Sequence, residues 1–376
     1  MNILIAPNAF KGSLSSPDAA KAMARGAGNA APTARITLIP VADGGDGLID
    51  SLSPYKRKTV TVAVRGPDAK PVKADYLVLK DGSAVIETAR ACGLALMKGK
   101  KLTPMTATSY GAGELIADAL KRGIRKIYIG LGGSATNDGG AGLASALGAK
   151  LSDKKGRQIP PGIEGLLHLA TIDTSGLNPL LKKAKLYALT DVTNPLLGKT
   201  GSARVYGPQK GATPAQVGIM DKALRHYAHV LKKCTGLSVG PMPRAGASGA
   251  MATGLFALCG ASLEDGASFT LNLLDFDKAA KSADIIITGE GCFDSQTFYG
   301  KAPAAVATVG KKYGKPVFII AGQSRAITVK HLADAGISAA WCLCGADISP
   351  QTAQKKAAAL VEAAAYYLVR EITGSL

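Results

Sequence analysis

The sequence predicts an α/β protein with a Rossmann-like, doubly wound parallel-sheet domain and an inserted second α/β domain with a mixed sheet. Near both chain ends, short apolar runs alternate with Ala-rich helical segments, which is typical of a parallel sheet. Between them lie β-branched runs joined by Gly, Asp and Pro turns, which favour antiparallel pairing. The length of 376 residues suggests two domains. We expect one domain from residues 1–53 and 276–376, and the inserted one from 54–275.

The first elements of the chain establish the parallel pattern. Residues 1–7 form an apolar run, and an Ala-rich helix is expected over 16–29. Ser16 and Pro17 are typical of a helix start, with Ser as N-cap and Pro at the first helical position. A second strand follows at 36–41. A strand, a helix and a strand in this order predict a parallel sheet.

The middle of the chain begins with strands that are typical of β-hairpins and continues with both strands and helices. The expected strands are 59–65, 71–79, 83–88, 124–130 and 185–190, and the expected helices are 111–121, 141–147 and 215–233. The last hundred residues return to the first pattern. Strands are expected at 284–288, 316–321 and 337–344, with a closing helix at 351–372.

Composition limits the classes of function. The net charge of +18 favours anionic partners but does not select among nucleic acid, membrane headgroups and small anionic metabolites. Aromatic residues are 5% and are not interleaved with basic ones, which argues against a nucleic-acid surface. No apolar stretch is long enough for a membrane span, and the six cysteines are too sparse for a disulfide scaffold. We expect a cytoplasmic protein with small-molecule partners, and a homodimer is left open.

A glycine-rich loop at residues 130–140 is the first candidate site. It follows a predicted strand and precedes a helix, so its backbone N–H groups can converge on an anion. Ser134, Thr136 and Asn137 add side-chain donors, and Asp138 could hold a metal ion. The alternative is a tight strand-to-helix turn. The residues expected to contact phosphate are Gly132, Gly133, Ser134 and Asn137.

Two nucleotide fingerprints nearly match and are rejected. The Gly-rich pattern at 130–135 lacks an acidic ribose anchor about twenty residues on, where Lys150 stands. Residues 193–200 mimic a P-loop, but Thr193 replaces its first glycine and Pro195 stiffens it. A nucleotide, if bound, therefore needs another kind of site.

Carboxylates at predicted strand ends are the second set of candidates. Asp43 and Asp46 follow the strand at 36–41 in a loop with Gly44 and Gly45, where they could bind a cation or accept a proton. A helix N-cap and a first-turn acid would explain them equally well. Asp191 follows the strand at 185–190, with Asn194 nearby. A catalytic Asp and a turn-forming Asp are about equally common there.

Further charged groups follow the first predicted strand and the predicted strand at 284–288. Glu290 lies between glycines after the strand at 284–288, and Asp294 and Lys301 follow closely. Lys11, with Ser13, follows the first strand and could supply a point charge for phosphate or carboxylate, although surface lysines are ordinary. Because these strand ends come from both predicted domains, we expect them to meet at a cleft between the domains. Such a cleft suits metal-assisted phosphoryl transfer.

At these residues the chain resembles the type I glycerate kinases. The matching blocks are APNAFKGSL at 6–14, PVADGGDG at 40–47, GLGGSATNDGG at 130–140, DVTNPL at 191–196, YGPQKG at 206–211, ITGEG at 287–291, DSQT at 294–297 and GKAP at 300–303. They follow the family's order over nearly the whole chain. The resemblance implies phosphorylation of D-glycerate by ATP with Mg²⁺, giving 2-phosphoglycerate, and two α/β domains with the site between them.

Several positions depart from the family's pattern. The family usually has Asp-Ser-Phe where residues 8–10 read Asn-Ala-Phe, and Glu where Asp46 stands. It also differs at 247–250 and 292–293. These changes bear on substrate fit more than on reaction type. Two alternatives stay open: a catalytically impaired glycerate-binding sensor, and a kinase for a related small hydroxy acid.

The predicted site combines residue chemistry with position. Asp191 is expected to be the base for the substrate hydroxyl, with Asp43 as the runner-up, and Lys11 to hold anionic oxygens. The complete prediction has Asp191, Asp43 and Lys11 as catalytic residues; Ser13, Gly44, Gly45, Gly132, Gly133, Ser134, Asn137, Asn194 and Lys301 as substrate- or phosphate-binding residues; and Glu290, Asp46 and Asp294 as Mg²⁺ ligands.

Overall fold

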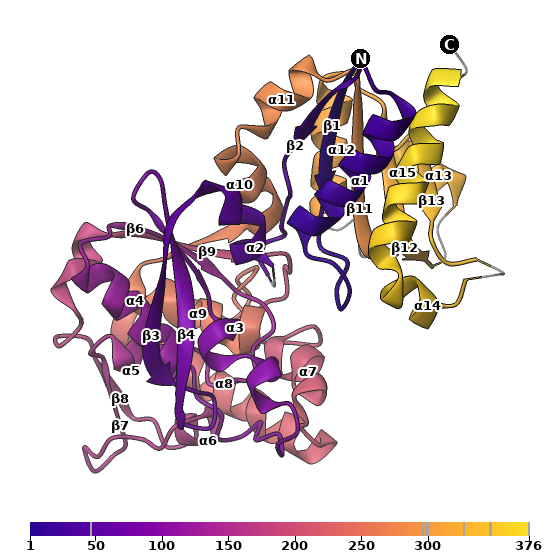
Figure 1. The fold of residues 1–376 in the computed structure, drawn as a ribbon. Coiled ribbons are helices and arrows are strands. Elements are labelled where there is room, and N and C mark those ends of the chain that lie inside the picture. Colours follow the sequence, from indigo (N-terminus) through magenta and orange to yellow (C-terminus); the bar gives the residue numbers. More distant parts are fainter. Residues whose placement is uncertain (46, 295–296, 298–300, 326–327, 346–347, 375–376) are drawn as a thin grey trace. The chain divides into compact units, whose positions relative to one another are not determined.

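The computed structural model is an α/β protein, which confirms the predicted fold class (Figure 1). It describes residues 1–45, 47–294, 297, 301–325, 328–345 and 348–374. The chain divides into two compact units. Unit 1 comprises Met1–Asp43, Asp50–Leu52 and Asp265–Leu376, and unit 2 comprises Gly44–Ile49 and Ser53–Glu264. The domain limits expected from the sequence, at 53/54 and 275/276, stay a prediction that limited proteolysis can test.

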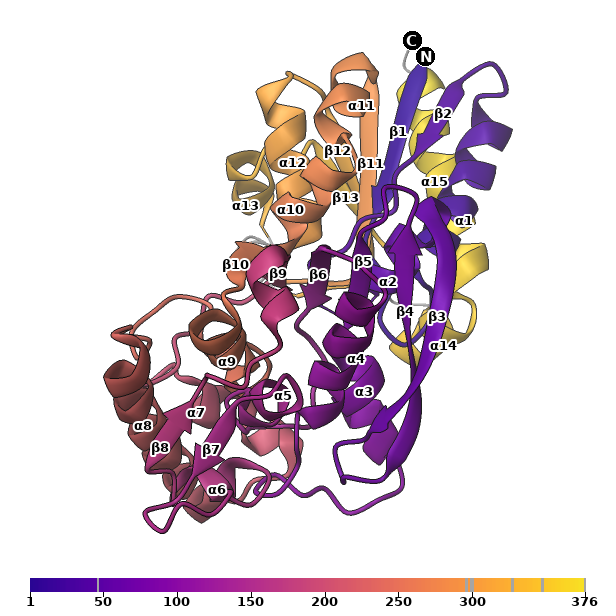
Figure 2. The ribbon, with the colours of Figure 1, turned by 90° about the vertical axis from the view of Figure 1, so that its left-hand side faces the viewer.

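Unit 1 contains a five-stranded sheet in the order β13-β12-β11-β1-β2, and all its pairings are parallel. Its strands are β1 (Asn2–Pro7), β2 (Arg35–Leu38), β11 (Ile285–Phe293), β12 (Val317–Ser324) and β13 (Ala339–Cys342). Its helices are α1 (Ser16–Ala30), α10 (Gly266–Leu273), α11 (Phe276–Ser282), α12 (Ala302–Lys312), α13 (Val329–Asp334), α14 (Pro350–Lys355) and α15 (Ala357–Gly374). Helices α1 and α15 pack together on one face of the sheet, and α11 and α12 cover the other (Figure 2). The unit is therefore doubly wound.

Three local features of unit 1 differ from the sequence-based expectation. The N-cap of α1 is Ser15 and not Ser16, because the Ser15 side chain accepts a hydrogen bond from the Asp18 amide. Strand β11 continues past the expected end and includes Glu290. Gly289 allows this continuation, since a side chain there would clash with the carbonyl oxygen of Ile320 on β12. The expected closing helix is two helices, α14 and α15.

Unit 2 is built on a six-stranded mixed sheet in the order β10-β9-β6-β5-β4-β3. Strands β3, β4 and β5 pair antiparallel, whereas β5, β6 and β9 pair parallel, which confirms the predicted mixed sheet. The strands are β3 (Lys56–Arg65), β4 (Pro71–Leu79), β5 (Ala84–Glu87), β6 (Lys126–Gly130), β9 (Lys185–Thr190) and β10 (Ser262–Asp265), and a separate pair is β7 (Lys150–Ser152) with β8 (Thr171–Asp173). The helices are α3 (Ala89–Cys92), α4 (Tyr110–Lys121), α5 (Ala141–Ala146), α6 (Ile163–Leu166), α7 (Ser202–Tyr206), α8 (Pro214–Thr235) and α9 (Ala247–Cys259), while α2 (Leu48–Leu52) includes residues of both units.

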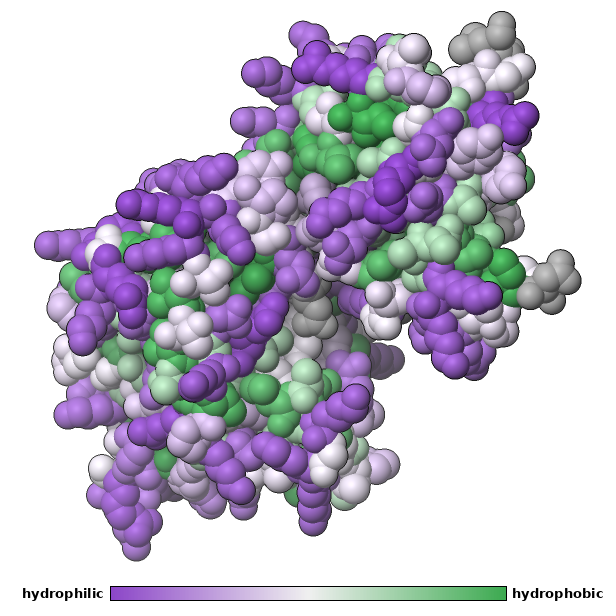
Figure 3. Space-filling view, viewed as in Figure 1, coloured by the Kyte–Doolittle hydropathy of each residue, from purple (hydrophilic) through white to green (hydrophobic). Residues whose placement is uncertain are grey.

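The surface agrees with the charge balance of the sequence. On the face shown in Figure 3, hydrophilic side chains cover most of the surface of each unit, and hydrophobic residues are visible in small areas. Among the described residues, no helix is long and apolar enough to cross a membrane.

Candidate active site

The strand order of unit 1 indicates where a ligand should bind. From β1 the chain passes to β2 on one side and later returns to β11 on the other, so the strand order reverses between β1 and β11. Open parallel sheets bind ligands at such a reversal, outside the carboxyl ends of the strands. The residues that follow β1 and those at the end of β11 meet this condition.

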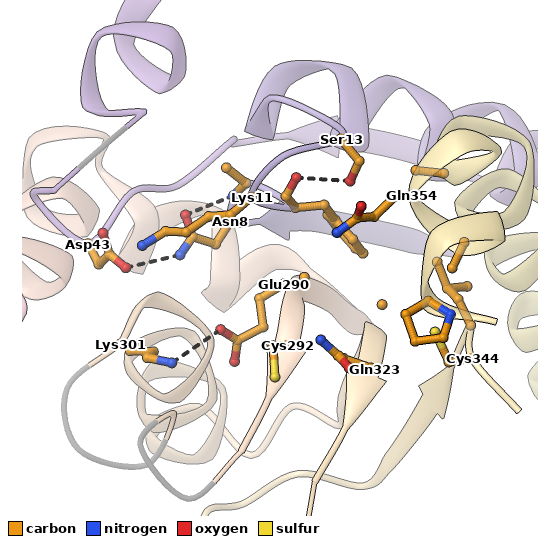
Figure 4. A pocket seen from close by; sticks show the side chains of 18 residues that line it. Asn8, Lys11, Ser13, Asp43, Glu290, Cys292, Lys301, Gln323, Cys344 and Gln354 are labelled. Atoms are coloured by element: carbon orange, nitrogen blue, oxygen red, sulfur yellow. Dashed lines mark hydrogen bonds and ion pairs between the residues drawn. The ribbon is translucent and has the colours of Figure 1, made fainter. Parts of the chain in front are cut away.

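A pocket of about 280 Å³ lies at this edge of the sheet (Figure 4). All its lining residues belong to unit 1. Five residues singled out in the sequence line it: Lys11, Ser13, Asp43, Glu290 and Lys301. The structure thus brings these five residues together within unit 1, and the expected meeting with residues of the other domain at a cleft stays a prediction.

Asn8 fixes the loop after β1 and was missed as a functional residue. Its amide N–H donates to the Gly289 carbonyl at 2.8 Å, which ties the loop to β11. The side-chain Nδ2 donates to Asp43 Oδ2 at 3.2 Å, and Oδ1 accepts from the Ala9 amide. Both Asn8 and Asp43 are buried. In the sequence, the one indication of a role for Asn8 was its position, where the family that the chain resembles usually has Asp.

Glu290 has the most unusual electrostatic environment of the pocket. Its side chain is buried, and Thr297 Oγ1 donates to Oε1 at 2.5 Å. Lys301 Nζ lies 3.9 Å from Oε2. Burial raises the pKa of Glu290 to about 7, and repulsion from Asp43 and Asp294 adds to this, while Thr297 and Lys301 oppose it. A carboxyl that titrates near neutral pH beside a cavity is typical of functional sites.

Glu290, which lines the pocket, and the neighbouring Asp294 form a donor set that suits Mg²⁺. This ion usually takes one or two carboxylates together with water and phosphate oxygens. Glu290 and Asp294 offer such a pair, because Lys301 Nζ contacts both, at 3.9 Å from Glu290 and 3.6 Å from Asp294 Oδ1. Among the described residues there is no cluster of three or more His, Cys, Asp or Glu side chains that could hold a metal alone. Asp46, the third predicted ligand, lies outside the described residues.

In unit 2, the buried side chain of Lys210 contacts the glycine-rich loop at 130–140 from the interior of the unit. Lys210 Nζ donates to Ser134 Oγ at 3.1 Å and to the Thr136 carbonyl at 2.6 Å. Burial lowers the pKa of Lys210 to about 8. Sequence reasoning missed this residue, although it lies in the block at 206–211. The side chain of Ser134 is thus already engaged within unit 2.

The other predicted phosphate-binding residues of this loop differ in exposure. Asn137 is buried, and its Nδ2 donates to the Pro104 carbonyl at 3.1 Å. Gly132 is half-buried and Gly133 is exposed. The backbone at these two glycines is therefore what the loop offers to a ligand, and its phosphate-binding role stays a prediction.

Asp138 serves the fold, and the sequence-based interpretation as a metal ligand finds no support. Its fully buried carboxylate accepts from the amides of Ser109, Gly140 and Gly142 and from Ser109 Oγ, at 2.8–3.2 Å. Burial raises its pKa, and these hydrogen bonds oppose the rise. They hold the start of α4 and the start of α5 against the loop. The turn alternative considered for this segment thus explains Asp138.

Asp191 and Asn194 lie in unit 2 after β9. Asn194 accepts from Tyr206 Oη at 2.6 Å and donates to the Thr200 carbonyl at 2.8 Å. Burial, together with the charge of Asp191, raises the pKa of Tyr206 to about 12. Asp191 is half-buried, as a residue that meets substrate can be. That it joins the pocket residues of unit 1 stays a prediction.

Gly44 and Gly45 are buried in unit 2, next to the same loop. The Gly44 carbonyl accepts from the Leu131 amide at 3.0 Å. Glu87, which sequence reasoning did not single out, caps the segment that follows by accepting from the amides of Gly47 and Ile49. These bonds hold Gly44 and the segment after Gly45 in place, and the role of the two glycines in phosphate binding stays a prediction.

Comparison with known proteins defines the class of the molecule. Residues 3–373 match the model of the glycerate kinase family. A glycerate kinase of Halalkalibacterium halodurans is 42% identical over 96% of both chains, and a glycerate 2-kinase of Escherichia coli is 44% identical over 86% of this chain and 85% of its own. A crystal structure from Salmonella typhimurium LT2, whose protein is described as a glycerate kinase 2, has a TM-score of 0.87 and 40% identity and covers 100% of this chain and 99% of that one.

The fold and the match over the whole chain define a kinase, an enzyme whose class implies the use of ATP. The chain belongs to the glycerate kinase family. The resemblance in the ordered sequence blocks is thereby confirmed.

Proposed function

We propose that the enzyme transfers the γ-phosphoryl group of ATP to the C2 hydroxyl of D-glycerate, giving 2-phosphoglycerate and ADP. The observation that carries this proposal is the pocket of unit 1, which holds Lys11, Lys301, Asp43 and Glu290 at the carboxyl edge of a parallel sheet. The name of the Escherichia coli relative, a glycerate 2-kinase, favours the C2 position. The sensor alternative is not favoured, because the relatives are named as kinases.

The reaction forms one bond and breaks another. The substrate hydroxyl oxygen attacks the γ-phosphorus, and the bond from the γ-phosphorus to the bridging oxygen breaks, so that ADP leaves with the electron pair. The hydroxyl proton passes to a carboxylate. Lys11 and Lys301 offset the negative charge of the phosphates and of the glycerate carboxylate. Mg²⁺, held by Glu290 and Asp294, would neutralise phosphate charge.

Asp191 is the proposed base for the hydroxyl, with Asp43 as the second candidate. Replacing Asp191 by Asn keeps its size but removes its ability to take a proton, so we expect turnover to fall about a hundredfold or more. A coupled assay for ADP measures it. The same change at Asp173, an exposed aspartate of unit 2 with no proposed role in the reaction, is the control. Turnover of Asp191→Asn near that of the wild type would remove Asp191 from the mechanism.

Phosphorus NMR of the product from ATP and D-glycerate tests the proposed function directly. A new phosphomonoester signal coupled to the C2 proton, together with ADP, is expected. Phosphorylation at C3 would overturn the position, and a related hydroxy acid turned over in preference to D-glycerate would overturn the substrate. Binding of D-glycerate without ADP formation would overturn the kinase activity and favour a sensor.

A further inference from the structure

The pocket of unit 1 has a second end that the roles proposed above leave unused. Asp43 and Lys301 lie at one end, and Gln354 and Cys344 at the other, with Glu290 between them (Figure 4). The second end is formed by residues that follow β13 and by residues of α14 and α15. Its apolar lining includes Leu343, Pro350, Ala353 and Ala357, of which all but Pro350 are buried. The pocket is therefore charged at one end and mainly apolar at the other.

D-glycerate does not account for this second end. A three-carbon acid with two hydroxyls and a carboxylate is polar over its whole surface, so apolar walls would desolvate it without compensation. A planar heteroaromatic ring has the opposite requirement, since its faces are apolar and its edge carries donors and acceptors. Small-molecule sites combine these features in the same way, with apolar walls and a few placed polar groups.

Two amide side chains lie where they can contact such an edge. Gln323, at the end of β12, and Gln354, on α14, both line the pocket. A glutamine amide offers a donor and an acceptor together, which matches the amino group and adjacent ring nitrogen of adenine. Ala353 on α14 and Ala357 on α15 present only small side chains to the pocket.

The two ends of the pocket lie over different strands of the sheet. Glu290 is on β11, whereas helix α14 packs against the neighbouring strand β12 and Leu343 follows β13. A base at one end would direct its phosphate chain toward Lys11 and Lys301 at the other.

We propose that the apolar end of this pocket binds the adenine ring of ATP, so that unit 1 alone holds the nucleotide from its base to its phosphates. The inference rests on the proposed function, because it assigns the nucleotide of that reaction. It places the base between Leu343 and helix α14, with Gln354 at the ring edge.

Two substitutions on α14 and a matched control test the proposal. Ala353→Phe fills the apolar end. Gln354→Leu removes the amide group at a residue that is exposed, so the change should not disturb the core. Gln351→Leu changes the same residue type on the same helix, at an exposed position that does not line the pocket. Calorimetric titration of each full-length protein with adenosine and with ADP measures binding without turnover. Thermal unfolding shows whether each variant is folded.

We expect Ala353→Phe to weaken adenosine and ADP binding at least tenfold. Gln354→Leu should weaken both by about 2- to 10-fold, the loss typical of one hydrogen bond. Gln351→Leu should bind like the wild type. In steady-state assays the KM for ATP should rise in the first two variants, while the KM for D-glycerate stays unchanged.

Other outcomes overturn the proposal in distinguishable ways. Unchanged adenosine affinity in Gln354→Leu and in folded Ala353→Phe places the base elsewhere, even if the wild type makes 2-phosphoglycerate. A higher KM for D-glycerate with an unchanged KM for ATP assigns the apolar end to the acid. If the wild type forms no ADP yet binds adenosine in the manner expected, the proposed function fails and the base site stands.

Discussion

Glu290 in unit 1 and Lys210 in unit 2 are both buried charged side chains, yet their surroundings differ. Lys210 is buried beneath the glycine-rich loop and donates to Ser134 and to the Thr136 carbonyl. Glu290 lines a cavity of about 280 Å³. Burial shifts the pKa of both toward neutral, to about 8 and about 7. A shifted pKa therefore indicates a reactive group only where the group also faces a cavity.

Two aspartates repeat the contrast. Asp138 and Asp43 both lie in glycine-rich segments after a parallel strand, and the sequence alone gave each a possible metal or catalytic role. Asp138 accepts four hydrogen bonds from backbone amides and a serine. Asp43 is held by the Asn8 amide group and lines the pocket. The first carboxylate stabilises a turn, and the second is placed to meet a ligand.

The largest expected effect is on the stability of unit 2. Asp138→Asn turns one carboxylate oxygen into an NH₂ group that faces amide donors, so at least one buried donor loses its acceptor. We expect a loss of about 2–4 kcal/mol in the free energy of unfolding, measured by urea denaturation at pH 7. Asp173→Asn, at an exposed aspartate of the same unit, is the control. A stable Asp138→Asn variant would mean that the carboxylate is held for function and not for the turn.

The substitution Glu290→Gln is expected to lower the turnover of the enzyme. The change keeps the acceptor for Thr297 but removes the negative charge from the pocket. We expect turnover in the ADP-coupled assay to fall about a hundredfold, the lower range for loss of a group that acts on the reacting atoms. Glu362→Gln, which breaks a surface pair with Arg25 in the same unit, should be near wild type. Equal turnover in both variants would place Glu290 outside the mechanism.

The same substitution should affect stability with a sign set by pH. Because the folded protein holds a proton on Glu290 up to about pH 7, the wild type loses stability relative to Glu290→Gln as pH rises from 4.5 to 7. At 1.36 kcal/mol per pKa unit, the difference reaches about 3 kcal/mol. Thermal unfolding without added Mg²⁺ should therefore show Glu290→Gln as the more stable protein at pH 8. A wild type that gains on the variant with rising pH would contradict this.

Lys210→Met is expected to cost less than Asp138→Asn. The change removes a buried charge, which is favourable, but leaves the Thr136 carbonyl and Ser134 hydroxyl without their donor. We expect a net loss of about 1–3 kcal/mol at pH 7. The loss should grow between pH 8 and 10.5, because the folded wild type no longer has to keep Lys210 charged there and gains stability over the variant.

Urea denaturation against pH measures this effect. Lys222→Met, at an exposed position of α8, is the control and should show no such dependence. If Lys210→Met proves more stable than the wild type at pH 7, the buried ammonium is kept for a role other than holding the loop.

Sequence reasoning reached the fold class because hydrophobic periodicity and strand order follow from local pattern. It also reached Lys11, Asp43 and Glu290, since polar residues after parallel strands must share one edge of a sheet. It could not distinguish Asp138 from Asp43, because the difference lies in which distant amides point at the carboxylate. Lys210 was missed for a similar reason: its burial depends on packing against a loop more than seventy residues away in the chain.

The smallest expected effect refines the account of Glu290. The Thr297 hydroxyl donates to Glu290 and lowers its pKa, so Thr297→Val, which removes the hydroxyl at nearly constant volume, should raise the pKa of Glu290 above about 7. Carbon-13 NMR of the Glu290 carboxyl, titrated without added Mg²⁺, measures the shift. Thr308→Val, which removes a hydroxyl bonded to its own helix α12, is the control. A lower pKa in Thr297→Val would show that water entering the pocket outweighs the lost hydrogen bond, and that Thr297 acts on Glu290 mainly by excluding water.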